Sequence, residues 1–195
     1  RKDLMLAGGK QDQYAATFGG VNYMEFYDDD KVIVNPLRIK SEYLCELENN
    51  LVLYFTATSR ESAAIIKEQQ KNVEDRNDRS IEAMHQLKEQ SRMMKEALLK
   101  GRLQEIGEIL DFGFEQKIKM ASNISNPLIQ EIYQATKKAG ASGGKISGAG
   151  GGGFMIFYCP GNTRYKVIDA LAKFGGQVRQ YNFTKHGLTT WTAQL

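Results

Sequence analysis

The amino-acid sequence predicts an α+β fold, and three observations support that prediction. The chain has 195 residues, of which 42% are hydrophobic and 25% charged, so it can bury a core of domain size. Short runs rich in aromatic and β-branched residues, bounded by Gly, Asn or Asp, favour strands. Apolar residues at helical spacing fill the long stretch between these runs. In the second half, helices are followed by strand, helix and strand, which is typical of helices packed on one face of a small sheet.

Three runs in the first third of the chain have the composition and length of strands: Val21–Tyr27, Lys31–Val34 and Leu51–Thr56. The first two flank Asp28-Asp29-Asp30, a polar turn, so we predict a hairpin. The third run is continuously apolar, which is typical of a strand buried on both faces. Ahead of them, Gln13–Phe18 is a compact apolar segment that Gly19-Gly20 interrupts, and we expect a short helical piece there.

The middle of the chain is predicted to be helical. In order, the expected helices are Ser62–Gln70, a long helix from the N-cap Ser80 to Gly101, a helix over Leu103–Leu110, and one that opens at Asn126-Pro127 and closes at Gly140. Asn72–Arg79 is polar and charged, so we expect a hinge between two units there. Methionines at helical spacing in the long helix indicate core packing and not a cofactor site. The remaining predicted elements are a strand over Phe154–Tyr158, a helix capped by Asn162 or Thr163 that runs through Phe174 to Gly175-Gly176, and a strand over Val178–Phe183.

Charge and composition exclude several classes of function. The 26 Lys and Arg against 23 Asp and Glu leave a net charge of +3, too small to indicate a nucleic-acid or membrane partner. The longest apolar stretch, Phe154–Cys159, is far shorter than the roughly 20 residues that span a bilayer. Cys45 and Cys159 lie far apart and outside any Cys/His cluster, so we predict no zinc site and two buried free thiols in a reducing cytoplasm.

The stretch Gly143–Gly153 is the most unusual part of the sequence, because glycine fills all but one of its last six positions. Glycine lets backbone N–H groups approach a ligand with no Cβ in the way, and successive N–H groups form a concavity that binds anions. Lys145 and Ser147 stand beside it. A flexible linker is the alternative, but the capped helix before the stretch and the strand after it favour phosphate contact.

Two common nucleotide-binding motifs do not apply to this stretch. Gly148, Gly150 and Gly153 have the spacing of a dinucleotide fingerprint, but they precede a strand, whereas the fingerprint follows a strand and opens a helix. A Walker A loop needs Ser or Thr after Gly-Lys, and here Ile146 follows Lys145.

Asp12 is a candidate catalytic carboxylate. It follows the diglycine Gly8-Gly9 and stands close to Lys10, and a carboxylate beside a cation stays ionised and can take a proton from a hydroxyl group. The alternative is that Asp12 caps the short helical piece that follows. Spacing alone favours the cap over the catalytic role.

The glycine stretch Lys145–Gly153 resembles the third motif of the GHMP kinases, a superfamily that includes galactokinase, homoserine kinase and mevalonate kinase. Gly8–Tyr14 resembles the segment of its sugar-kinase branch that carries the catalytic aspartate. Three further segments, Tyr14–Gly20, Asn35-Pro36-Leu37 and Tyr54-Phe55-Thr56, are similar to the D-glycero-D-manno-heptose phosphate kinases.

This resemblance implies phosphoryl transfer from ATP, with Mg²⁺, to a sugar hydroxyl. It makes Asp12 the catalytic base and Lys10, Gln13 and Arg60 the substrate-binding residues. Arg60 is a candidate for holding the phosphate already on the sugar, because guanidinium binds phosphate with two hydrogen bonds, and Lys10 is a second candidate. For both of these cations a solvated or structural ion pair is the alternative. The residues implied for the phosphate-binding loop are Lys145, Ser147, Gly148, Ala149, Gly150, Gly151 and Gly152.

The resemblance also implies an architecture. Residues 1–70 would be the end of an N-terminal β/α domain, and 71–195 a C-terminal, ferredoxin-like α+β sandwich. Complete GHMP kinases carry a sugar-recognition segment and a glycine-rich nucleotide loop ahead of this region, and neither occurs in these 195 residues. We therefore expect a C-terminal portion that needs the missing N-terminal half of the same protein and is inactive alone.

The acceptor stays open at this point. The anomeric hydroxyl of D-glycero-D-manno-heptose 7-phosphate is preferred by resemblance, and galactose and fucose are alternatives. The rival hypothesis is a non-catalytic domain that binds a phosphorylated sugar or a partner chain.

Overall fold

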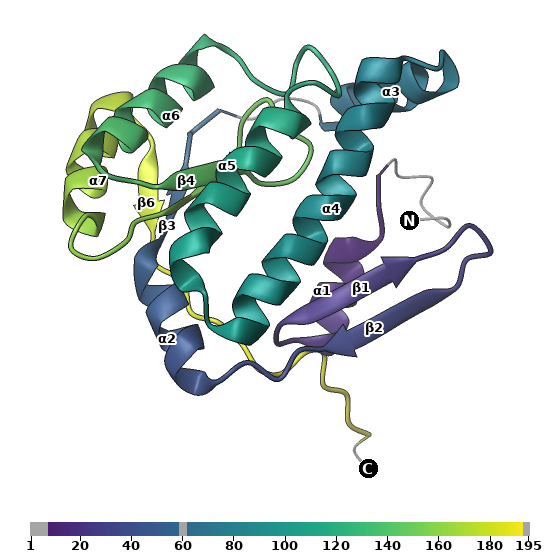
Figure 1. Ribbon diagram of the computed structural model, residues 1–195, viewed down its shortest axis with the longest axis horizontal. Helices are drawn as coiled ribbons and strands as arrows, with labels where there is room; N and C mark the ends of the chain where they lie inside the picture. The colour runs from purple at the N-terminus through teal and green to yellow at the C-terminus, as the bar shows by residue number, and fades with distance from the viewer. Residues whose placement is uncertain (1–7, 59–61, 193–195) are drawn as a thin grey trace.

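The computed structural model describes residues 8–58 and 62–192, and within them helices and strands are mixed as predicted (Figure 1). In chain order the elements are α1 (Gln11–Phe18), β1 (Asn22–Phe26), β2 (Val32–Pro36), α2 (Ser41–Asn50), β3 (Leu51–Phe55), α3 (Ser62–Glu74), α4 (Asp78–Lys100), α5 (Ile106–Lys117), α6 (Pro127–Ala139), β4 (Gly143–Ile146), β5 (Phe154–Tyr158), α7 (Arg164–Leu171) and β6 (Gln177–Arg179). Short 3₁₀ turns precede α5 and follow α7.

The strands form two separate sheets. β1 and β2 pair as the predicted antiparallel hairpin, with Asn22 opposite Pro36. The other sheet has the order β4-β5-β3-β6, and every neighbouring pair in it is antiparallel. In Figure 1 the hairpin and α1 lie on one side of α4, and the four-stranded sheet with α5, α6 and α7 lies on the other.

The main core lies on one face of the four-stranded sheet. Val52 and Tyr54 of β3 are opposite Phe157 and Met155 of β5, and all four side chains are buried. They belong to one cluster with buried residues of three helices: Phe114 of α5, Ile129, Ile132 and Tyr133 of α6, and Val167 and Leu171 of α7. Burial alternates along β3, so the prediction that this strand is fully buried on both faces is wrong. The face opposite Val52 and Tyr54 is only partly covered.

The position of β3 bears on the division predicted at residue 70. β3 precedes that point, yet it pairs with β5 on one side and β6 on the other. The sheet therefore combines residues from both sides of the predicted division. The physical reason is that an apolar strand such as Leu51–Phe55 can pair with strands far along the chain, and pairing of this kind leaves no trace in local sequence pattern.

Several predicted boundaries are confirmed, and others differ. Gly101 and Gly140 end α4 and α6 in the left-handed conformation, as predicted. α4 begins earlier than predicted, because Asn77 is its N-cap and accepts a hydrogen bond from the Ser80 N–H at 3.0 Å. The Ser80 hydroxyl instead donates to the Met120 carbonyl at 3.1 Å. β6 is shorter than the predicted run. Of the two free thiols, Cys159 is buried and Cys45 is exposed, so the prediction of burial is wrong for Cys45.

The first part of the glycine-rich stretch is a strand and not a loop. Gly143–Ile146 pairs with β5, and Gly143 lets helix α5 come close. A Cβ atom on Gly143 would lie 1.8 Å from the Gly107 carbonyl oxygen of α5. At Gly143, glycine therefore serves helix-to-strand packing and not phosphate contact.

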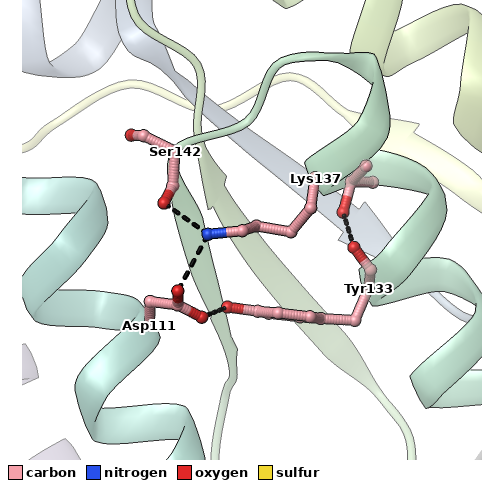
Figure 2. Close-up of polar contacts among 5 residues, drawn as sticks. Asp111, Tyr133, Lys137 and Ser142 are labelled. Carbon is pink, nitrogen blue, oxygen red and sulfur yellow. Dashed lines mark hydrogen bonds and ion pairs between the residues drawn. The ribbon is translucent and has the colours of Figure 1, made fainter.

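A polar cluster joins α5, α6 and the start of β4 (Figure 2). The Tyr133 hydroxyl donates to one oxygen of the Asp111 carboxylate, and the Lys137 ammonium contacts the other at 2.8 Å. Lys137 also donates to the Ser142 carbonyl at 2.8 Å. Burial, and then the hydrogen bond to Asp111, raise the pKa of Tyr133 well above its ordinary value. This cluster therefore holds α5, α6 and the residue before β4 in fixed positions relative to one another.

No helix in the two described ranges has the length and apolar character that crossing a membrane requires.

The close contact of α5 with β4 gives a first prediction. Gly143→Ala places a methyl group against the Gly107 carbonyl and is expected to lower the free energy of unfolding by about 3 kcal/mol. Urea denaturation followed by circular dichroism measures the loss. Gly9→Ala is the matched control, because a Cβ there meets no atom within 4 Å. Equal stability of the two variants would contradict the packing argument.

The cluster in Figure 2 gives a second prediction. Tyr133→Phe removes the hydroxyl that donates to Asp111 and leaves that carboxylate with one partner fewer, so we expect a loss of about 1–2 kcal/mol. Tyr165→Phe, on an exposed tyrosine of α7, is expected to change stability by less than about 0.5 kcal/mol. Thermal unfolding of both variants under the same conditions makes the comparison, and a Tyr133→Phe melting point equal to that of Tyr165→Phe would refute it.

Candidate phosphate loop and N-terminal acidic site

The loop between β4 and β5, residues 147–153, is anchored by hydrogen bonds on several sides. The Ser147 N–H donates to the Phe154 carbonyl at 2.8 Å and closes the base of the loop. The Gly151 and Gly153 N–H groups donate to the carbonyls of Ile124 and Thr58, each at 2.8 Å. So many attachments exclude the flexible linker that the composition left open.

Other N–H groups of the same loop are left available. Those of Gly148, Ala149, Gly150 and Gly152 donate to no acceptor within residues 8–58 and 62–192. Gly150 has φ +116°, and a Cβ on it would lie 2.9 Å from Ile124, so only glycine fits there. Available N–H groups that follow one another along a turn of this kind form an anion-binding concavity.

Two lysines increase the positive charge at the loop. Lys145 stands on β4 and is partly buried, and burial lowers its pKa. Lys117, the last residue of α5, donates from its ammonium to the Gly148 carbonyl. Burial, and then the charge of Lys145, lower the pKa of Lys117 to about 8. Neither lysine forms an ion pair in the described part of the chain. An anion bound here would compensate both charges.

Asp12 lies on α1, and the cavity that it lines includes no residue of this loop. Lys10, and not Asp12, takes the N-cap position, so the interpretation of Asp12 as a cap is wrong. Asp12 is exposed in the first turn and lines a cavity of about 430 Å³ between α1, the hairpin and α4. Asn22, Ser91 and Lys95 line the same cavity and offer polar groups to a ligand.

The other predicted substrate-binding residues have different surroundings. The Lys10 ammonium pairs with the Asp30 carboxylate at 2.5 Å, and this hydrogen bond raises the pKa of Lys10. A ligand phosphate would therefore compete with Asp30 for this cation. Gln13 is exposed on α1, one residue after Asp12. Arg60 lies outside the described residues.

Of the predicted site residues, the structure gathers Lys145 and the glycines around one loop and gathers Lys10, Asp12 and Gln13 at the start of α1. The sequence did not single out Lys117. It marked Asn126 only as a helix cap, whereas the structure shows that the Asn126 side-chain amide also donates to the Gly151 carbonyl at 3.2 Å. A lysine in the last turn of a helix is common, so no local signal marks Lys117. Within the described ranges no three carboxylate, His or Cys side chains gather as metal ligands.

Part of the chain matches a described protein family. Residues 94–177 match the family described as GHMP kinases C terminal. The chain is 44% identical, over 98% of its length, to D-glycero-alpha-D-manno-heptose 7-phosphate kinase of Campylobacter jejuni, and covers 56% of that protein. The chain therefore spans about half the length of the curated relatives it matches.

Solved structures give the same result. A D-glycero-D-manno-heptose 1-phosphate kinase from Bacteroides thetaiotaomicron superposes with a TM-score of 0.70 at 38% identity, over 98% of this chain and 52% of that one. Mevalonate kinase from L. major, at 20% identity, shares the fold with a TM-score of 0.71 over 88% of this chain and 51% of that one. The family match over residues 94–177, together with the 44% identity along nearly the whole chain, identifies a GHMP kinase C-terminal domain in this chain.

Proposed function

We propose that the chain is the C-terminal part of an ATP-dependent sugar-phosphate kinase, whose acceptor is the anomeric hydroxyl of D-glycero-D-manno-heptose 7-phosphate. The observation that carries the proposal is the loop 147–153, whose available N–H groups and neighbouring lysines suit a phosphate group. The 44% identity to a heptose 7-phosphate kinase supports the choice of acceptor.

In this proposal the two regions have separate tasks. The N–H groups of Gly148, Ala149, Gly150 and Gly152 donate to phosphate oxygens and stabilise the charge that develops during transfer. Asp12 accepts the proton of the sugar hydroxyl while that oxygen attacks the terminal phosphorus of ATP and the bond to ADP breaks. Lys10, Gln13 and Arg60 hold the sugar phosphate. Mg²⁺ would neutralise part of the charge on the phosphates of ATP.

The proposal assigns the hairpin with α1 to the end of the N-terminal domain. It assigns the four-stranded sheet, including β3, and its helices to the ferredoxin-like C-terminal domain. This moves the boundary predicted at residue 70 to a point before β3. Turnover would further require the segment that relatives carry beyond the matched half, so the chain alone is inactive. A cytoplasmic location belongs to the same proposal.

The third prediction tests activity and the role of Asp12 together. The segment that precedes the matched region in the Campylobacter jejuni relative is fused ahead of Arg1, and ATP consumption is measured with D-glycero-D-manno-heptose 7-phosphate and Mg²⁺. We expect turnover in the fusion and none in the chain alone. Asp12→Asn in the fusion is expected to lower kcat by about 10²–10⁴-fold, because the general base is removed.

Asp169→Asn, on the exposed surface of α7, is the matched control and is expected to keep full activity. An Asp12→Asn fusion as active as this control would remove Asp12 from the mechanism. A fusion without turnover, in a chain that still binds phosphate, would favour the rival non-catalytic binding domain.

A different sugar is the second candidate, favoured by the 25% identity to a bifunctional fucokinase from Arabidopsis thaliana over 83% of this chain. The same assay with fucose and galactose decides between the acceptors. Higher kcat/KM for either sugar than for the heptose phosphate would overturn the proposed acceptor.

A further inference from the structure

Rigid peptide units determine how the loop 147–153 presents its N–H groups. A trans peptide unit is planar, so the carbonyl of one residue and the N–H of the next point in opposite directions. No peptide bond in the described residues is cis. A contact that holds a carbonyl of the loop therefore also aims the following N–H.

Besides that of Ser147 at the base of the loop, two peptide units of the loop are held through their N–H groups. The Gly151 N–H donates to the Ile124 carbonyl, and the Gly153 N–H donates to the Thr58 carbonyl. These N–H groups are occupied by protein acceptors and are not available to a ligand.

Apart from the Gly153 carbonyl, which accepts from Thr56 at the end of the loop, two other peptide units are held through their carbonyls, and each by a side chain. Lys117 donates to the Gly148 carbonyl, whose peptide unit carries the Ala149 N–H. Asn126 donates to the Gly151 carbonyl, whose peptide unit carries the Gly152 N–H. The N–H groups of Ala149 and Gly152 have no acceptor within the described ranges. The side chains thus hold the units whose N–H groups stay available.

Asn126 has a second contact that explains its residue type. Its side-chain oxygen accepts from the Ile129 N–H at 3.0 Å and caps α6, while its nitrogen donates to the loop. Serine, threonine or aspartate also caps a helix, but ionised aspartate has no donor, and a hydroxyl would have to accept from Ile129 and donate to Gly151 through one atom on a shorter side chain. Among these caps, asparagine alone offers an acceptor and a donor on separate atoms, and it uses one for the helix and the other for the loop.

We propose that Lys117 and Asn126 are positioning residues, which aim the N–H groups of Ala149 and Gly152 at a bound phosphate. The proposal rests on the phosphate-binding role of the loop given above. Lys117 also adds positive charge that attracts a phosphate, whereas Asn126 adds none. Comparing the two residues therefore separates the effect of orienting the N–H groups from the effect of electrostatic attraction.

The test follows backbone amide signals of the full 195-residue chain by NMR while inorganic tripolyphosphate is added. In the unmodified chain we expect the Ala149 and Gly152 amide signals to move most and the Gly151 and Gly153 signals to move least. Similar movement of all four would overturn the proposal. This comparison needs no variant, so it holds even if a substitution prevents folding.

Variants then test each side chain. Asn126→Ser keeps a cap for α6 and is expected to weaken tripolyphosphate binding about tenfold, and to remove the shift of the Gly152 signal, because the amide donor is lost. Asn77→Ser changes the matching N-cap of α4, which does not contact the loop, and is expected to bind like the unmodified chain.

Lys117→Met is expected to weaken binding at least tenfold, and Lys117→Arg, which keeps the donor and the charge, to restore most of it. Lys119→Met is the control for charge, because it removes an equal charge two residues away, from a side chain that contacts Gln116 instead of the loop. It is expected to bind tripolyphosphate like the unmodified chain. A purely structural role would lower the melting temperature and leave the affinity of the folded chain unchanged.

The outcomes separate the two proposals. If the unmodified chain binds tripolyphosphate at the loop, and Asn126→Ser and Lys117→Met bind it equally well, the positioning proposal alone fails. If no amide of the loop responds to tripolyphosphate in the unmodified chain, the phosphate-binding role of the loop fails and the positioning proposal fails with it.

Discussion

Backbone atoms of α5 and β4 meet at Gly107 and Gly143, where a methyl group on Gly143 would lie 1.8 Å from the Gly107 carbonyl oxygen. This contact sets how α5 lies on the sheet, and so it sets where the last residue of the helix, Lys117, is held. β4 leads directly into the loop 147–153, so the same contact brings the Lys117 side chain to the Gly148 carbonyl. The polar cluster around Asp111 keeps α6 in the matching position.

The loop illustrates how a chain segment with almost no side chains is made rigid. Its hydrogen bonds run to Thr56 and Thr58 after β3, to Ile124 and Asn126 before α6, and to Lys117 at the end of α5. Binding groups mounted on rigid elements need less reorganisation when charge develops on a ligand, and this is where electrostatic stabilisation is most effective. The conformational freedom of glycine thus lets the loop adopt an unusual backbone conformation, and hydrogen bonds from the neighbouring segments then hold that conformation.

Electrostatics at the two candidate regions differ in kind. At the loop, Lys117 and Lys145 are partly buried and repel each other, which lowers the pKa of Lys117 to about 8. At the start of α1, Lys10 is compensated by Asp30. Within the described residues, the lysines at the loop have no acidic partner, whereas Lys10 has one. The loop is therefore the stronger candidate for binding a highly charged phosphate group, and the cavity at Asp12 suits an acceptor rich in hydroxyl groups.

Local sequence determined much of this protein: the hairpin at Asp28–Asp30, the ends of α4 and α6 at Gly101 and Gly140, the Asn126 cap and the glycine-rich character of the loop. Each of these depends on residues that are near neighbours in the chain. Tertiary structure alone decided that β3 joins the later strands, that Gly143 serves packing, and that Lys117 reaches the loop. These outcomes depend on contacts between segments far apart in the chain. In sequence, an apolar strand looks the same whichever strands it pairs with, and so does a lysine at a helix end whichever group it contacts. The reason is that side-chain type determines what a group can bind, whereas only the fold determines which groups are within reach.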